Sequence, residues 1–303
     1  MFNRRHLLIA LAALLCMAAA PAIAQDWKQK YPELTFAIIP AENASGVVER
    51  FTPFVEYLTR ELGVPVKLRV VQDYAGVIEG LRAGQIHIAM MSAGSYARAH
   101  LIGVKAEPFA IEVNADGSKS HRSVFYVLKD SPYHKIEDLA GKNLGLVDTN
   151  STSGNQVPRF ALDKMGINPA QFFGKIVYTG SHENAVIALQ QGTVDVAANW
   201  WTDENESNLR RMERRGLAKY DDFRIVFSSD PIMNAPIVYL EDLPDDLKSA
   251  IREAMFNIRE RRGEEVFNRL YEGNMRGWEP VTHEAYKPYV ELIKFVDAVR
   301  KRS

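Results

Sequence analysis

The stretch from Asp148 to Gly154 reads Asp-Thr-Asn-Ser-Thr-Ser-Gly and carries the clearest chemical signal in the sequence. It follows an apolar segment typical of a strand and precedes a segment with helical spacing, so it is predicted to begin a helix. Free backbone N–H groups and the positive end of the helix dipole meet at such a start. The hydroxyls of Ser151, Thr152 and Ser153 add donors. The pattern suits an oxyanion, although serine and threonine are equally typical of an ordinary helix N-cap.

Two further polar side chains are predicted near the same place because each follows a strand. His182 comes after a strand at 175–178 and can donate a hydrogen bond to an oxyanion or, when protonated, match its charge. Tyr74 comes just after a strand at 66–71 and offers its hydroxyl. The alternative for His182 is a capping or packing role, and the alternative for Tyr74 is a half-buried tyrosine.

Two adjacent tryptophans, Trp200 and Trp201, are followed by Asp203 and Glu204. Aromatic rings beside carboxylates suit an ammonium group through cation–π contacts and ion pairing. A core tryptophan next to a surface one, followed by an acidic helix start, explains the pattern equally well. The arginine-rich stretch at 210–215 is interpreted as a solvated helix end.

Motifs for catalysis and for metal binding are missing from the sequence. It has no Gly-x-Ser-x-Gly elbow, no lysine at the spacing of a nucleotide P-loop after Gly154, and no histidine and carboxylate cluster with metal-ligand spacing. We therefore expect a protein that is not an enzyme and that needs no metal and no cofactor.

The first 24 residues are typical of a secretory signal peptide. Arg4 and Arg5 precede an apolar run at 7–20, and Ala22-Ile23-Ala24 predicts cleavage after Ala24. The predicted location is the periplasm, and the sequence does not decide between the general and the twin-arginine export routes. Cys16, the only cysteine, lies within this segment, so the mature chain is expected to lack disulfides.

Charge and length restrict the partners. The formal net charge is −1 for 303 residues, which argues against nucleic acid and means that an anion must be caught by a local site. Nothing in the sequence demands more than a monomer.

Two units with alternating strands and helices are predicted in series. The first has strands at 34–40, 66–71 and 86–91, and the second at 123–128, 143–147, 175–178 and 194–198, with returning strands at 225–227 and 237–239. Two amphipathic helices are expected at 245–262 and 286–300. Two open α/β lobes place ligands in the crevice at the carboxyl ends of their strands, where Asp148, His182 and Tyr74 are predicted to lie.

In their order, these segments resemble the periplasmic phosphonate-binding components of ABC transporters. The resemblance rests on Phe51-Thr52-Pro53-Phe54, Asp73-Tyr74-Ala75-Gly76-Val77-Ile78, Asn150-Ser151-Thr152-Ser153-Gly154 with Val157-Pro158, His182-Glu183, Val194-Asp195-Val196-Ala197 and Pro236-Ile237-Val238. It implies a type II two-lobed α/β fold in which each lobe is a mixed, mainly parallel sheet flanked by helices. Two hinge strands would join lobe one (25–119 plus 236–303) to lobe two (120–235).

The resemblance also implies which residues bind. Tyr74, Ser151, Thr152, Ser153 and His182 would hold the phosphonate oxygens, and a permease in the inner membrane would be the transient partner. In members that bind aminoethylphosphonate, acidic residues take the amine. Here Glu204-Asn205 resembles such a segment, but Asn234-Ala235 replaces the acid expected before Pro236, and Met91-Ser92 replaces a family Tyr-Gly. The tail is therefore assigned to Met91, Ser92, Trp200, Trp201, Asp203, Glu204 and Asn234.

The resulting hypothesis is a solute-binding protein that closes two lobes over a phosphonate, such as aminoethylphosphonate. One alternative is a receptor for another oxyanion, namely phosphite, a phosphate ester or a sulfonate. Another is a periplasmic sensor that reports its ligand to a membrane kinase. Phosphoester hydrolysis is the weakest alternative because an activated nucleophile is not evident.

Overall fold

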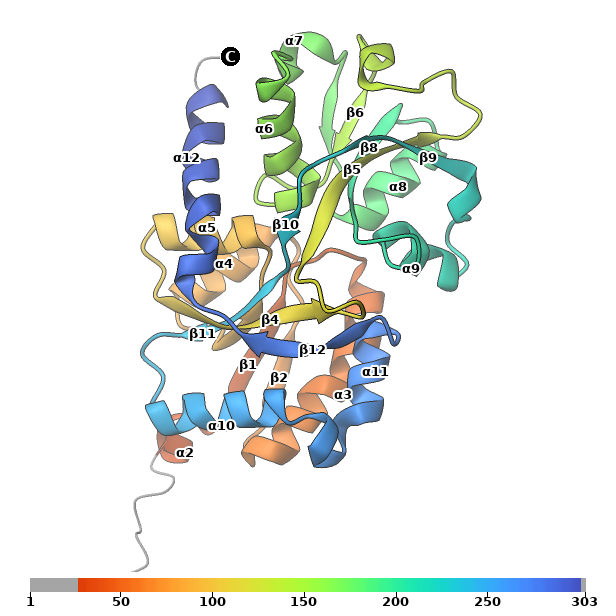
Figure 1. The fold of residues 1–303 in the computed structure, drawn as a ribbon. Coiled ribbons are helices and arrows are strands. Elements are labelled where there is room, and N and C mark those ends of the chain that lie inside the picture. Colours follow the sequence, from red (N-terminus) through yellow and green to blue (C-terminus); the bar gives the residue numbers. More distant parts are fainter. Residues whose placement is uncertain (1–26, 301–303) are drawn as a thin grey trace, which may run out of the picture.

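The computed structural model describes residues 27–300, which form two mixed sheets with their helices, one above the other in Figure 1. The predicted signal peptide and its cleavage after Ala24 lie outside the described residues. We call the first sheet with its helices lobe one and the second sheet with its helices lobe two.

Lobe one contains a six-stranded sheet with the order β12-β4-β11-β3-β1-β2. Its strands are β1 (Leu34–Ile38), β2 (Val66–Arg69), β3 (Ile88–Met90), β4 (Ala106–Asn114), β11 (Pro236–Leu240) and β12 (Met275–Pro280). Its main helices are α3 (Ala44–Leu62), α4 (Tyr74–Arg82), α5 (Ala93–Leu101), α10 (Asp245–Phe256) and α11 (Glu264–Tyr271), preceded by the short α2 (Trp27–Lys30). Phe36, Phe51 and Phe54 pack together between β1 and α3.

Lobe two contains the order β10-β5-β8-β6-β7, with β9 paired to β5. Its strands are β5 (Ser120–Leu128), β6 (Leu144–Leu146), β7 (Ile176–Tyr178), β8 (Val196–Trp201), β9 (Phe223–Ser228) and β10 (Ile232–Met233). Its helices are α6 (Val157–Lys164), α7 (Pro169–Phe172), α8 (His182–Gln190) and α9 (Asn208–Arg214). A smaller core around Phe125, Leu144 and Leu162 fills one face of this sheet.

The chain crosses between the two sheets twice, at 115–119 and at 234–235. The two crossings are held side by side, because the amide of Asn234 donates to the carbonyl oxygen of Lys119 (2.9 Å). Helix α12 (Lys287–Arg300) packs on α5 of lobe one and on α6 of lobe two, where Phe160 meets Phe295 edge-on. The C-terminal helix therefore braces both lobes (Figure 1).

The two-lobed α/β architecture is confirmed, but the sheets are not mainly parallel. In each sheet of the described chain, parallel pairing is confined to two strand pairs: β1 with β2 and β3, and β6 with β7 and β8. The remaining pairs are antiparallel because β11 in lobe one and β5 in lobe two run opposite to the parallel strands and pair with a strand on each side. The helix predicted at 245–262 ends earlier, at Phe256, and a kink at Arg262 separates it from α11.

Candidate binding site between the lobes

The predicted helix start follows β6, and its first turn is wider than an α-helical turn. The Thr152–Gln156 segment forms a π-helical turn, in which the amide of Gln156 donates to the carbonyl oxygen of Ser151 (3.0 Å). Pro158 lacks an N–H and so cannot continue the α-helical ladder back into this turn. The hydroxyl of Ser151 caps it by accepting from the amide of Gly154 (3.0 Å). A Cβ at Gly154 would lie 2.3 Å from Val147, so the turn packs this closely on the end of β6 only with glycine.

A cavity of about 130 Å³ lies between the lobes at the carboxyl ends of their parallel strands. Both lobes line it. Seven of the residues predicted from the sequence are on its wall: Tyr74, Ser92, Ser151, Ser153, His182, Trp200 and Asn234.

At one end of the cavity, buried polar atoms lack partners. In the described part of the chain, neither the hydroxyl of Tyr74 nor Nδ1 of His182 has a hydrogen-bond partner. Nε2 of His182 lies 3.5 Å from the hydroxyl of Ser151. Buried polar groups without partners are rare and costly, and they mark places where a bound molecule would complete the hydrogen bonding.

The two imidazoles of this end are uncharged at neutral pH. Burial, helped by the nearby His121 and opposed by a hydrogen bond with Asn199, lowers the pKa of His182 to about 3. Burial also lowers the pKa of His121 to about 4, opposed by its hydrogen bond with Asn234. An oxyanion here would meet hydroxyl and N–H dipoles, so His182 is better suited to donate a neutral hydrogen bond than to supply the cation considered from the sequence.

Five predicted residues do not line the cavity. Thr152 instead accepts a hydrogen bond from the amide of Gly94 across the lobes (2.7 Å), and Met91 is fully buried in the core of lobe one. Trp201 points away because successive side chains of β8 alternate sides, and its Nε1 donates to Tyr220 (3.3 Å). Asp203 and Glu204 lie in the turn after β8. Asp203 accepts a hydrogen bond from the amide of Asn205 in the same turn, and Glu204 accepts one from the hydroxyl of Tyr220.

Sequence reasoning missed several polar residues of the wall: Arg50, Glu112, His121, Arg211 and Tyr271. They come singly from α3, β4, β5, α9 and α11, and no local motif marks them. Arg211 also corrects the interpretation of 210–215 as a solvated helix end, since its side chain is only 17% exposed.

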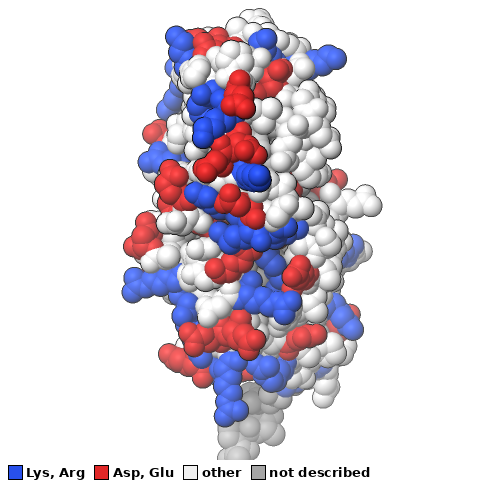
Figure 2. Space-filling model, turned by 90° about the vertical axis from the view of Figure 1, so that its right-hand side faces the viewer, with Lys and Arg blue, Asp and Glu red and all other residues white. Residues whose placement is uncertain are grey.

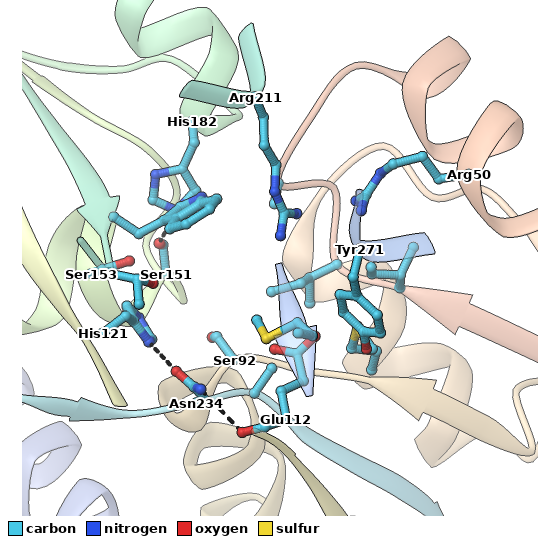
Figure 3. A pocket seen from close by; sticks show the side chains of 18 of the residues that line it. Arg50, Ser92, Glu112, His121, Ser151, Ser153, His182, Arg211, Asn234 and Tyr271 are labelled. Carbon is cyan, nitrogen blue, oxygen red and sulfur yellow. Dashed lines mark hydrogen bonds between the residues drawn. The ribbon is translucent and has the colours of Figure 1, made fainter. Parts of the chain in front are cut away.

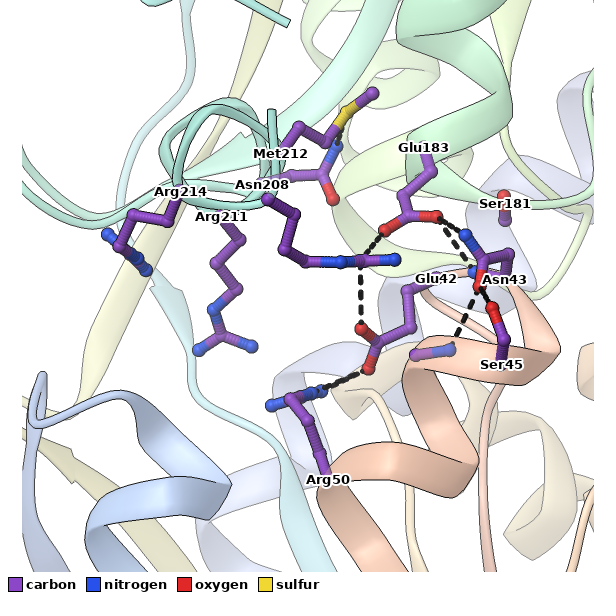
Figure 4. Close-up of polar contacts among 12 residues, drawn as sticks. Glu42, Asn43, Ser45, Arg50, Ser181, Glu183, Asn208, Arg211, Met212 and Arg214 are labelled. Carbon is purple, nitrogen blue, oxygen red and sulfur yellow. Dashed lines mark hydrogen bonds and ion pairs between the residues drawn. The ribbon is translucent and has the colours of Figure 1, made fainter. Parts of the chain in front are cut away.

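Charged residues bridge the lobes beside the cavity (Figure 4). The carboxylate of Glu183 in lobe two accepts from the amide and from the side chain of Asn43 in lobe one (3.0 and 2.7 Å). Arg215 pairs with Glu183 and reaches Glu42 across the gap (3.4 Å). Together with the Gly94–Thr152 bond, these contacts hold the lobes in a closed arrangement.

One face of the molecule shows no area of a single charge sign (Figure 2). Figure 2 shows Lys and Arg mixed with Asp and Glu over a face that extends across both lobes. Selection of an anion must therefore come from the cavity itself.

A sequence model of the family described as "ABC transporter, phosphonate, periplasmic substrate-binding protein" matches residues 36–286. This chain belongs to that family. It is 32% identical over 266 residues to the phosphonates-binding periplasmic protein of Escherichia coli, covering 86% of this chain and 74% of the relative. It is 27% identical over 241 residues to a phosphate-import protein of Mycolicibacterium smegmatis, covering 75% of this chain and 74% of the relative.

Solved structures of phosphonate-binding proteins share the fold. A binding component of a phosphonate ABC transporter from Pseudomonas aeruginosa has a TM-score of 0.79 at 25% identity, covering 89% of this chain and 88% of that one. A Prochlorococcus marinus protein in complex with methylphosphonate has a TM-score of 0.73 at 20% identity, covering 88% and 98%. Members of the phosphonate-binding family are solute-binding components of ABC importers, so a membrane permease is the implied partner.

Among residues 27–300, no helix has the length and apolar character needed to cross a bilayer. The same residues contain no group of three or more side chains suited to hold a metal ion.

The buried histidines predict acid sensitivity. A folded-state pKa below the ordinary 6.5 means that the unfolded chain binds more protons, so stability present at pH 7 is lost as the pH falls below 6.5. Between pH 7 and pH 5, each histidine should lower the free energy of unfolding by about 2 kcal/mol. Urea unfolding at both pH values measures this. His182→Gln should reduce this loss of unfolding free energy by about half. The control His134→Gln, at an exposed position outside the cavity, should leave the loss unchanged.

The contact between lobes predicts the effect of a methyl group at Gly94. A Cβ there would lie 1.7 Å from the side-chain oxygen of Gln156, which is itself buried. Gly94→Ala should therefore disfavour the closed arrangement and weaken ligand binding roughly 10-fold, since overpacking costs about 1–3 kcal/mol. Small-angle scattering should show a larger radius of gyration. Gly277→Ala, where a Cβ meets nothing within 4 Å, is the control. An unchanged radius and affinity in Gly94→Ala would contradict this view of closure.

Proposed function

We propose that this protein captures a phosphonate in the cavity between its lobes and delivers it to an ABC permease. The observation that carries the proposal is the pair of buried, unpartnered polar atoms on Tyr74 and His182, on the wall of the cavity that Ser151 and Ser153 also line. A tetrahedral head group with three oxygens would accept from these donors and from the free amides of the helix start.

Contributions from both lobes make binding and closure one event. Tyr74 belongs to α4 of lobe one, whereas Ser151, Ser153 and His182 belong to lobe two. A ligand held by both stabilises the closed form over the open form by its differential contacts. For Thr152 we propose a part in closure, because its hydroxyl oxygen accepts a hydrogen bond from the amide of Gly94 in the other lobe.

We also propose that the protein is a non-catalytic monomer, exported by a signal peptide that is cleaved after Ala24. Ser151 and His182 are neighbours, but a base whose pKa is about 3 is too weak to activate a hydroxyl at neutral pH. Nδ1 of His182 has no carboxylate partner among the described residues to orient the ring, as a catalytic triad requires.

Another phosphorus oxyanion is the second candidate. The names of two relatives support it: the phosphate-import protein of M. smegmatis and a probable phosphite-binding protein of P. marinus, 26% identical over 245 residues. Calorimetry with methylphosphonate, aminoethylphosphonate, phosphite, phosphate, sulfate and a sulfonate separates the candidates. We expect binding of a phosphonate in preference to phosphite and phosphate. Heat from sulfate or a sulfonate alone would overturn the proposal.

Removing one hydroxyl tests the head-group contact directly. Tyr74→Phe should weaken phosphonate binding roughly 10- to 100-fold, because a hydrogen bond to a charged group contributes about 1.5–3 kcal/mol. The melting temperature of the empty protein should change little, since the hydroxyl makes no hydrogen bond of regular geometry, although Ser151 lies near enough to interact with it.

A matched control exists in lobe two. Tyr126 is also buried, with an unpartnered hydroxyl, but it does not line the cavity. Tyr126→Phe should leave the affinity unchanged in the same titration. Equal affinities of Tyr74→Phe and the wild-type protein would contradict a ligand contact at Tyr74.

A further inference from the structure

The end of the cavity away from Ser151 is walled by charged groups of both signs. In Figure 3, Ser151 and Ser153 lie on one side of the open space, and Arg50, Arg211 and Tyr271 lie on the other. Glu112 rises from β4 into the same space. Arg50, Glu112 and Tyr271 belong to lobe one, and closure of the lobes brings Arg211 of lobe two to them.

The carboxyl group of Glu112 has no cationic partner. It takes part in none of the ion pairs among the described residues, although Arg211 and Arg50 lie close enough to influence it. Burial raises the pKa of this carboxyl, opposed by the charge of Arg211 and by a hydrogen bond from Tyr271. The hydroxyl oxygen of Tyr271 already accepts from Nε1 of Trp278 (2.9 Å), which leaves its proton for Glu112. A half-buried carboxylate that receives one neutral hydrogen bond and forms no direct ion pair can still accept a cation from the ligand.

The side chain of Arg211 is held by Glu206 on the side away from the cavity, and its remaining N–H groups face the cavity. Its Nε donates to Glu206 (2.6 Å), a side chain that is 3% exposed. Its guanidinium lies 4.9 Å from the ring centre of Trp200, which also lines the cavity. Glu206 is shared with Arg214, and the carboxylates of Glu42, Glu272 and Glu112 also lie near enough to act on the charge of Arg211. The planar fork of a guanidinium suits a carboxylate in two-point contact.

Glu112 and Arg211 thus face one cavity without pairing with each other. We propose that the tail of the bound phosphonate carries both an ammonium and a carboxylate group, with the ammonium on Glu112 and the carboxylate on Arg211. This deepens the proposed function and rests on it, because the phosphorus head group must occupy the Ser151 end for the tail to reach these residues. An alkyl tail would leave both charges without a partner from the ligand, and an amine alone would serve only Glu112.

Four ligands with one head group test the proposal on the unaltered protein: methylphosphonate, 2-aminoethylphosphonate, 3-phosphonopropionate and 2-amino-3-phosphonopropionate. Calorimetry should give the tightest binding for the last, roughly 100-fold or more tighter than for methylphosphonate, as two buried charged contacts are gained. Methylphosphonate binding as tightly as the amino-carboxylate ligand would overturn the proposal. Silence with all four would refute phosphonate binding itself, a different failure.

Variants assign each group to its residue. Glu112→Gln should weaken the two amine-bearing ligands at least 10-fold and leave 3-phosphonopropionate unaffected. Arg211→Gln should weaken the two carboxylate-bearing ligands and leave 2-aminoethylphosphonate unaffected.

The matched control for Arg211 is Arg214→Gln, because Arg214 pairs with the same Glu206 but does not line the cavity. It also removes an ion pair with Glu272 of lobe one, so any loss of affinity should be the same for all four ligands and independent of the tail. If Glu112→Gln and Arg211→Gln each lowered the affinity for all four ligands equally, with normal melting curves, these residues would not recognise the tail.

Discussion

The contact between α5 and the Thr152–Gln156 turn governs the geometry of the whole site. The amide of Gly94 donates to the hydroxyl of Thr152, and the side chains of Gln156 and Thr152 pack so closely on Gly94 that no side chain fits there. The same turn carries Ser151 and Ser153 to the cavity wall. The same short segment therefore lines the head-group end of the cavity and forms part of the contact between the lobes. Any molecule that orders this turn also acts on the seam, which couples binding to closure without a separate device.

The electrostatics of the two ends of the cavity differ. At the Ser151 end the groups are uncharged dipoles, because burial keeps the imidazoles of His121 and His182 neutral. At the other end, Arg50 and Arg211 face the cavity while carboxylates hold them from behind. Oriented dipoles suit a compact oxyanion, whereas charges placed on rigid supports discriminate between substituents.

Much of this organisation could be predicted from the sequence, because it depends on local pattern. The strand before Asp148, the helix start after it, and the positions of Tyr74 and His182 beyond strand ends all follow from periodicity and turn chemistry. The direction in which each side chain points cannot be predicted from these patterns. Thr152 and Trp201 lie next to cavity residues in sequence but point elsewhere, since neighbours in a turn or strand face different sides. Glu112 and Arg211 are adjacent to the cavity only through the tertiary fold, and in sequence they resemble ordinary surface charges.

The two ends of the cavity are also encoded differently. The Ser151 end is largely one short continuous segment, tied by Gly94 and Gly154 to its surroundings, so most substitutions there disturb closure as well as contact. The wall at the other end is assembled from single residues on α3, β4, α9 and α11, none of which holds the lobes' backbones together. Point mutations can therefore alter that wall one residue at a time while the head-group turn is inherited intact. Such an arrangement lets duplicated genes evolve different ligand specificities without first losing the ability to bind the head group.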